Sequence, residues 1–143
     1  MNTLATTIEQ SKHLLELGLS TDSADMWWSN RFVYWKSTPM IGIATEQNQL
    51  YTFKWCDEDV PAWSLSALLK VMPKEIKKDD KQYSFHLETT HNLYYVSYYR
   101  YDIDGIRYLH TTELNNCTID AAYEIVCWLL EQGLIKKGGQ DGM

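Results

Sequence analysis

The sequence predicts an α+β domain in which a largely antiparallel sheet of about five strands is covered by about three helices. Three observations predict this class. Apolar residues recur at helical spacing in three separate segments, each bounded by helix start and stop signals. Residues 83–113 alternate in the manner of strands and are interrupted twice by turn sequences. No linker divides the 143 residues, so residues 1–135 are expected to form one domain, followed by a flexible C-terminal tail at 136–143.

The first helix is expected to follow a threonine pair. Thr6 with Glu9, or Thr7 with Gln10, can form a capping box, and Gly18 is placed to end the helix in a left-handed conformation. Its apolar residues lie on one side, so this helix must rest on an apolar surface.

The next part of the chain favours strands. Residues 26–36 are rich in Trp, Phe, Val and Tyr, and residues 40–44 and 50–55 read as a strand pair around a polar turn. An acidic connector is expected to follow them.

The second helix is expected to start at Ser64, a good N-cap, and to stop before Pro73. The segment 74–81 mixes four lysines with three acidic residues and is interpreted as a solvated turn.

A C-terminal three-stranded meander is predicted within residues 83–113, with turns at the sequences THN (residues 90–92) and DIDG (residues 102–105). If both turns contain an even number of residues, the alternation of side chains sorts the meander into two faces. The more apolar face, chosen for the core, carries Tyr83, Phe85, Leu87, Tyr94, Val96, Tyr98 and Leu109, with Arg100 and Arg107 towards one end. The other face carries Ser84, His86, Glu88, Tyr95, Ser97, Tyr99, Tyr101, Tyr108 and His110.

The third helix is expected to start near Asn116 or Thr118 and to run to Gly133. Its polar residues form one narrow stripe, and apolar residues occupy most of the remaining circumference. So wide an apolar arc needs cover beyond one sheet face, from another helix or from a second subunit.

Charge and cysteine content exclude several function classes. The net charge is −6 and neither half of the chain is basic, which disfavours a nonspecific nucleic-acid binder. Cys56, Cys117 and Cys127 form no CxxC pair, so neither a disulfide framework nor a zinc site is suggested, and no metal or cofactor is expected. The first residues lack the features of a signal peptide, and no apolar run approaches the length of a membrane helix. The protein is therefore expected to be cytoplasmic.

The polar face of the meander is the candidate binding surface. The residues proposed for it are Tyr95, Tyr99, Tyr101, Tyr108, His86 and His110. Tyrosine is typical of recognition surfaces, although it also forms strands well and stabilises sheets without any ligand. Two alternative functions use the same face: an acid–base site of His86, His110 and Glu88, and base stacking on Tyr95 and Tyr99. The two arginines of the meander sort to the opposite face, which argues against the stacking of nucleic-acid bases.

Trp27, Trp28 and Trp63 are candidate interface residues, because they lie where strands enter connectors and exposed tryptophans often anchor partners. Trp63 has a second interpretation of equal weight, in which it packs onto the helix that begins beside it.

Three segments together resemble a group of small uncharacterised proteins encoded in bacteriophage and prophage regions of gut bacteria. These are EQSKHLLELGLSTDSADMWW, PAWSLSALLKVMP and IDAAYEIVCWLLEQGLI, in that order. The resemblance implies a bacterial or phage origin and a cytoplasmic setting, and it supplies no activity, cofactor or site residue. Because phage accessory proteins often act by binding other proteins, it favours a noncatalytic interaction module. The high aromatic content and the wide apolar arc of the third helix favour self-association as a homodimer, and another protein partner is the alternative. A small hydrolase or transferase and, less favoured, a single-strand binder are the alternatives.

Overall fold

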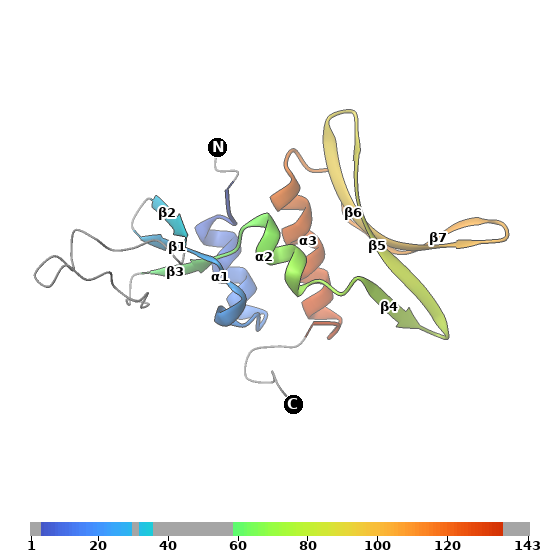
Figure 1. Ribbon diagram of the computed structural model, residues 1–143, viewed down its shortest axis with the longest axis horizontal. Coiled ribbons are helices and arrows are strands. Elements are labelled where there is room, and N and C mark those ends of the chain that lie inside the picture. Colours follow the sequence, from blue (N-terminus) through green and yellow to red (C-terminus); the bar gives the residue numbers. More distant parts are fainter. Residues whose placement is uncertain (1–3, 30–31, 36–58, 136–143) are drawn as a thin grey trace, which may run out of the picture.

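The computed structural model describes residues 4–29, 32–35 and 59–135, and it shows helices packed between two antiparallel sheets (Figure 1). The elements in chain order are α1 (Ile8–Glu16), the 3-10 helix η1 (Thr21–Ser23), β1 (Met26–Ser29), β2 (Phe32–Trp35), β3 (Val60–Ala62), α2 (Leu65–Val71), β4 (Glu75–Lys78), β5 (Lys81–Thr90), β6 (Leu93–Asp102), β7 (Gly105–Thr111) and α3 (Thr118–Glu131). The strand orders are β2-β1-β3 and β4-β5-β6-β7. The α+β class is confirmed, but the described strands form two sheets of three and four strands instead of one sheet of about five.

The small sheet corrects the prediction of one strand at residues 26–36. This segment forms an antiparallel pair, in which Ser29 of β1 lies opposite Phe32 of β2. β3, within the expected connector, pairs with the other side of β1. Pro61 fits there because β3 is an edge strand among the described strands of this sheet, so no described strand needs a hydrogen bond from its outer side. The strands predicted at 40–44 and 50–55, and the tail at 136–143, lie outside the described residues.

Of the two possible capping boxes on α1, the one between Thr7 and Gln10 forms. The Gln10 amide donates to Thr7 Oγ1 at 3.0 Å, and the Thr7 amide donates to Gln10 Oε1 at 2.9 Å. Thr6 is fully buried, and its hydroxyl bonds with Ser11 Oγ at 2.7 Å and accepts from the Trp63 amide at 3.1 Å. Gly18 follows the helix with a φ of +102°, as predicted.

Ser64 is the N-cap of helix α2, as predicted. The Ser64 hydroxyl accepts from the Ala67 amide at 3.2 Å and donates to Asp25 Oδ2 at 2.5 Å. Asp25 Oδ1 also accepts from the Ser64 amide at 2.9 Å. The cap therefore links the start of α2 to the segment that precedes β1.

The segment 74–81 is a strand and a tight turn, so its interpretation as a solvated turn was wrong. β4 pairs with β5, and Ile76 is only 4% exposed because its side chain enters the core. Asp79 and Asp80 have φ values of +53° and +63°, which suit a two-residue hairpin turn of the kind that requires two left-handed residues. One apolar residue among lysines gives too little alternation for the pattern to be read from the sequence.

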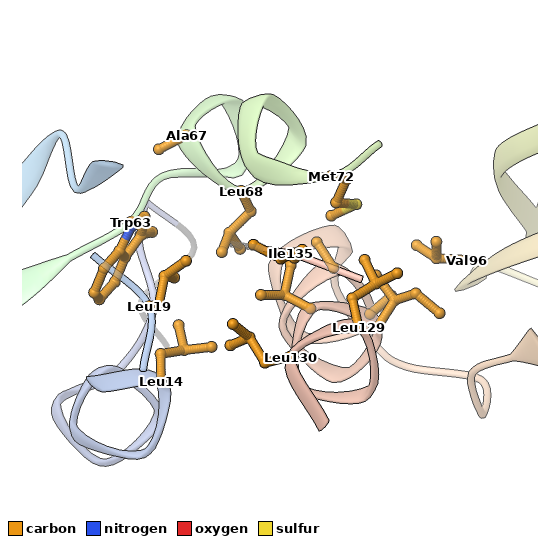
Figure 2. Packing of buried hydrophobic residues seen from close by; sticks show 14 of the residues in the cluster. Leu14, Leu19, Trp63, Ala67, Leu68, Met72, Val96, Leu129, Leu130 and Ile135 are labelled. Atoms are coloured by element: carbon orange, nitrogen blue, oxygen red, sulfur yellow. The ribbon is translucent and has the colours of Figure 1, made fainter. Parts of the chain in front are cut away.

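Helix α3 lies between the other helices and the four-stranded sheet (Figure 1). Its buried residues are Ile119, Ala121, Ala122, Ile125, Val126, Leu129 and Leu130. Figure 2 shows Leu130 near Leu14 of α1, and Leu129 on the side of α3 that faces Val96 of β6. The wide apolar arc of α3 is thus covered by its own chain, and it does not require a second subunit.

Candidate functional site

A β-bulge in β7 decides which side chains share a face of the four-stranded sheet. Tyr99 lies opposite Tyr108, but the next pair is Tyr98 with His110, so Leu109 is an extra residue on β7. Both turns of the meander hold two residues, as the prediction assumed. Because opposite residues in an antiparallel pair point to the same face, His110 joins Tyr98 on the core face.

The predicted position of His110 on the candidate binding surface was therefore wrong. Its ring stacks on Trp128 of α3, with centroids 4.2 Å apart and planes 5° apart. Burial lowers the pKa of His110, and the nearby Glu124 carboxylate partly opposes this shift. Since His86 and His110 lie on opposite faces, the proposed acid–base site with Glu88 is not formed.

The remaining face assignments of the meander agree with the register. All seven apolar residues chosen for the core face belong to the core cluster or pack against it. The opposite face carries a group of aromatic residues that we call the tyrosine face: Tyr95, Tyr99, Tyr101, Tyr108 and His86. Figure 1 shows α3 on one side of the sheet, and no described helix lies on the side of the tyrosine face.

Tyr99 is the centre of the tyrosine face. His86 stacks on it with centroids 3.6 Å apart and planes 5° apart. Tyr101 and Tyr108 contact it edge-on, at centroid distances of 5.7 and 5.3 Å. Tyr99 is consequently 5% exposed, whereas Tyr101 is 73% and Tyr108 is 52% exposed. The face therefore consists of a packed aromatic base with two protruding rings.

Two hydroxyl groups of this face, those of Tyr95 and Tyr99, have raised pKa values. Burial and the neighbouring Glu88 carboxylate raise the pKa of Tyr95. Burial, with smaller contributions from Tyr101 and Glu88, raises the pKa of Tyr99 to about 12. Such groups donate and accept hydrogen bonds, but they are not activated as bases or nucleophiles.

Base stacking on this face has little support from the geometry. Tyr99, one of the two proposed stacking residues, is covered by His86. Arg100 and Arg107 lie opposite each other on the other face of the β6–β7 hairpin, where both approach Asp102, at 3.6 and 3.5 Å. Stacked bases would need cations beside the phosphate backbone, and these two arginines point away.

The three tryptophans predicted as interface residues differ in how far they are buried. Trp63 is fully buried, so its proposed role at an exposed interface was wrong; it lies near Leu68 in the core, in agreement with packing on α2 (Figure 2). Trp27 is 5% exposed and its ring packs against Tyr34. Trp28 is half-buried and donates from Nε1 to the Thr6 carbonyl at 2.9 Å. Only Trp28 retains a partly accessible side chain.

Exposed apolar residues also occur outside the predicted binding surface and interface. Ile103, at the tip of the β6–β7 hairpin, is 95% exposed, and Ile106 at the start of β7 is 42% exposed. Phe32 of β2 is 62% exposed. The DIDG sequence predicted a turn, but nothing in it showed that this turn extends away from the other described helices and strands (Figure 1).

The described cysteines are not activated thiols. Burial raises the pKa of Cys127 to about 11, and burial also raises that of Cys117. Cys56 lies outside the described residues. Among residues 4–29, 32–35 and 59–135, no three His, Cys, Asp or Glu side chains are grouped so as to hold a metal ion.

Two cavities lie away from the tyrosine face. One of about 530 Å³ is bounded by η1 and the ends of α2 and α3, and one of about 240 Å³ lies between β4 and α3. Neither is lined by a residue of the tyrosine face. None of the described helices is long and apolar enough to span a membrane.

Comparison with known proteins gives no further guide to the site. No family model matches the chain, and neither a curated protein nor a solved structure matches it.

Proposed function

We propose that the protein is a noncatalytic interaction module that binds a protein partner through the tyrosine face. The observation that carries this proposal is the connected aromatic group around Tyr99, on a sheet face that no described helix covers. Tyrosines contribute strongly to protein interfaces because they bury a large rigid ring and keep a hydroxyl for hydrogen bonding. Tyr101 and Tyr108 offer this chemistry at 73% and 52% exposure.

The rest of the proposal concerns setting and partner. The resemblance of three segments to phage and prophage proteins supports a bacterial or phage origin and a cytoplasmic location. The partner is a protein, either a host or phage protein or a second copy of this chain. A catalytic function is not favoured, because His86 and His110 lie on opposite faces and because the pKa values of Tyr95, Tyr99 and the described thiols are raised.

Site-specific photocrosslinking tests the proposal. A photoreactive phenylalanine analogue replaces Tyr101, and in a second protein it replaces Lys12, which is exposed on α1. Both proteins are irradiated in lysate from phage-infected and uninfected bacteria. We expect discrete crosslinked proteins from position 101 that are absent from position 12. Identical crosslinks from both positions, or none from position 101, would contradict the proposal.

A matched pair of variants shows whether the aromatic rings themselves carry the binding. Replacing Tyr101 and Tyr108 with Ala should weaken capture of the crosslinked partner at least about tenfold, which corresponds to about 1.4 kcal/mol. Phe32→Ala removes an exposed ring from the other sheet and serves as the control. Equal loss in both variants would show that general exposure of apolar surface, and not the tyrosine face, explains the capture.

A further inference from the structure

β7 is a free edge of the four-stranded sheet. The strand order ends with β7, and within the described residues no strand pairs with its outer side. Residues 105–108 are all exposed. Amide and carbonyl groups on the outer side of such a strand can bond a further strand.

The two edges of this sheet differ in their protection against pairing. β4, the other edge, has four residues, and three of them are charged: Glu75, Lys77 and Lys78. Short length and lysines are the usual means by which proteins prevent an edge strand from pairing. β7 has seven residues and a single charged one, Arg107, between the exposed Ile106 and Tyr108. β7 is thus the edge that permits strand addition.

Charge at this end of the sheet favours a second copy as the added strand. Arg107 pairs with Asp102 at 3.5 Å and with Asp104 at 3.8 Å, and Arg100 approaches Asp102 at 3.6 Å. Two cations and two anions leave the hairpin end neutral, although the chain carries a net charge of −6. Two copies of an acidic chain repel each other least where the contact surface is neutral.

We propose that β7 pairs antiparallel with β7 of a second copy, so that two four-stranded sheets join into one. The two copies would be related by a two-fold axis perpendicular to the sheet, so each contact between them would occur twice. We infer that the axis passes at Ile106, which then lies opposite Ile106 of the second copy, while Arg107 lies opposite Gly105. An axis at Arg107 would oppose two arginines and would bring Leu109 of the bulge into the pairing, and like charges directly opposite destabilise a sheet.

This pairing deepens the proposed function. What it means for partner binding rests on the proposal that the tyrosine face binds a protein. A two-fold axis perpendicular to the sheet keeps corresponding faces on the same side. The tyrosine faces of the two copies would therefore adjoin, with Tyr101 and Tyr108 of each copy near the junction. The partner would meet one aromatic surface of twice the width.

Molar mass measured by light scattering during size exclusion, at several protein concentrations, tests the pairing. We expect a mass near twice 16.7 kDa that falls towards 16.7 kDa on dilution. Ile106→Glu places a carboxylate on the axis and should raise the dimer dissociation constant at least about tenfold. Lys77→Gln changes the net charge by the same amount on the β4 edge and should leave the mass unchanged. A wild-type monomer at every concentration, or a dimer unaffected by Ile106→Glu, would overturn the proposal.

Disulfide trapping tests the axis without relying on the glutamate variant. Ile106→Cys should give a crosslinked dimer under mild oxidation, because directly opposed residues of an antiparallel pair have Cα atoms about 4.5 to 5.5 Å apart, within disulfide range. Ile103→Cys, at the more exposed hairpin tip, is the control for random collision. Faster crosslinking at position 103 than at 106 would contradict the pairing.

These experiments distinguish a failure of the β7 pairing from a failure of the proposed function. If Ile106→Glu is monomeric and position 101 still crosslinks to a partner protein, the tyrosine face binds without the dimer. If the dimer forms and no partner crosslinks to position 101, the pairing stands and the proposed function fails.

Discussion

His110 lies parallel to Trp128, with ring centroids 4.2 Å apart, and this contact fixes the edge strand β7 to helix α3. It exists only because the bulge at Leu109 places His110 on the core face. Residues 105–108, which precede the bulge, are all exposed. β7 thus has two parts: His110, after the bulge, contacts α3, and residues 105–108, before the bulge, are exposed.

The His110 contact should make stability depend on pH. Burial lowers the pKa of His110 in the folded protein, so the unfolded chain, with a pKa of about 6.5, binds the proton more readily. The contribution of His110 to stability is complete above about pH 6.5 and is lost as the pH falls through that value towards the lower pKa of the folded state. Urea unfolding between pH 5 and 7.5 should show this decline, and His110→Gln should flatten it. An unchanged slope in the variant would assign the pH dependence to other groups.

The Tyr98 hydroxyl should contribute measurably to stability. It is buried and donates to the Pro73 carbonyl at 2.6 Å, which ties β6 to the segment between α2 and β4. Tyr98→Phe removes the donor and leaves this carbonyl without it, so we expect a loss of about 1 kcal/mol in the free energy of unfolding. Tyr101→Phe is the control, because that ring is 73% exposed. Equal effects of the two variants on the urea midpoint would contradict the assignment.

Trp63 should be among the most sensitive core positions. Its ring is fully buried, and Nε1 donates to Ser23 Oγ at 2.9 Å. Trp63→Ala creates a cavity and removes this bond, with an expected loss of about 3 to 5 kcal/mol in the free energy of unfolding. Trp35→Ala, at a position 48% exposed, should change it by less than about 0.5 kcal/mol. Thermal unfolding followed by circular dichroism separates the two variants.

Cys127 should react slowly with alkylating reagents in the folded protein. Burial raises its pKa to about 11, so little thiolate is present near neutral pH, and thiolate is the reactive form. Iodoacetamide labelling at pH 8, located by peptide mass, should modify Cys127 much faster in urea than in its absence. Equal rates would show that the thiol is accessible and unperturbed in the folded chain.

Local signals in the sequence were sufficient to predict most helices and strands and the apolar face of the meander. The Thr7 box, the Ser64 cap, Gly18 and the turn at residues 91–92 act through neighbours in the chain, so their chemistry is visible in the sequence. The apolar face of residues 83–98 was read correctly because it alternates regularly up to the bulge.

Features that depend on distant contacts could not be read in the same way. The bulge at Leu109 has no sequence mark, and its effect on His110 follows only from pairing with β6 and packing on α3. β4 was missed because Ile76 is its only buried residue. The division into two sheets depends on the helices that separate them, which is a tertiary fact.

The position of α3 also constrains how the protein is made. Its residues 118–131 are the last described helix to leave the ribosome, yet they lie between α1, α2 and the four-stranded sheet. Until they emerge, Leu14, Leu68 and Val96 have no common core to enter. We therefore expect a nascent chain synthesised only as far as residue 117 to expose apolar surface on both the helices and the sheet, and to be open to chaperones and proteases until α3 has been made.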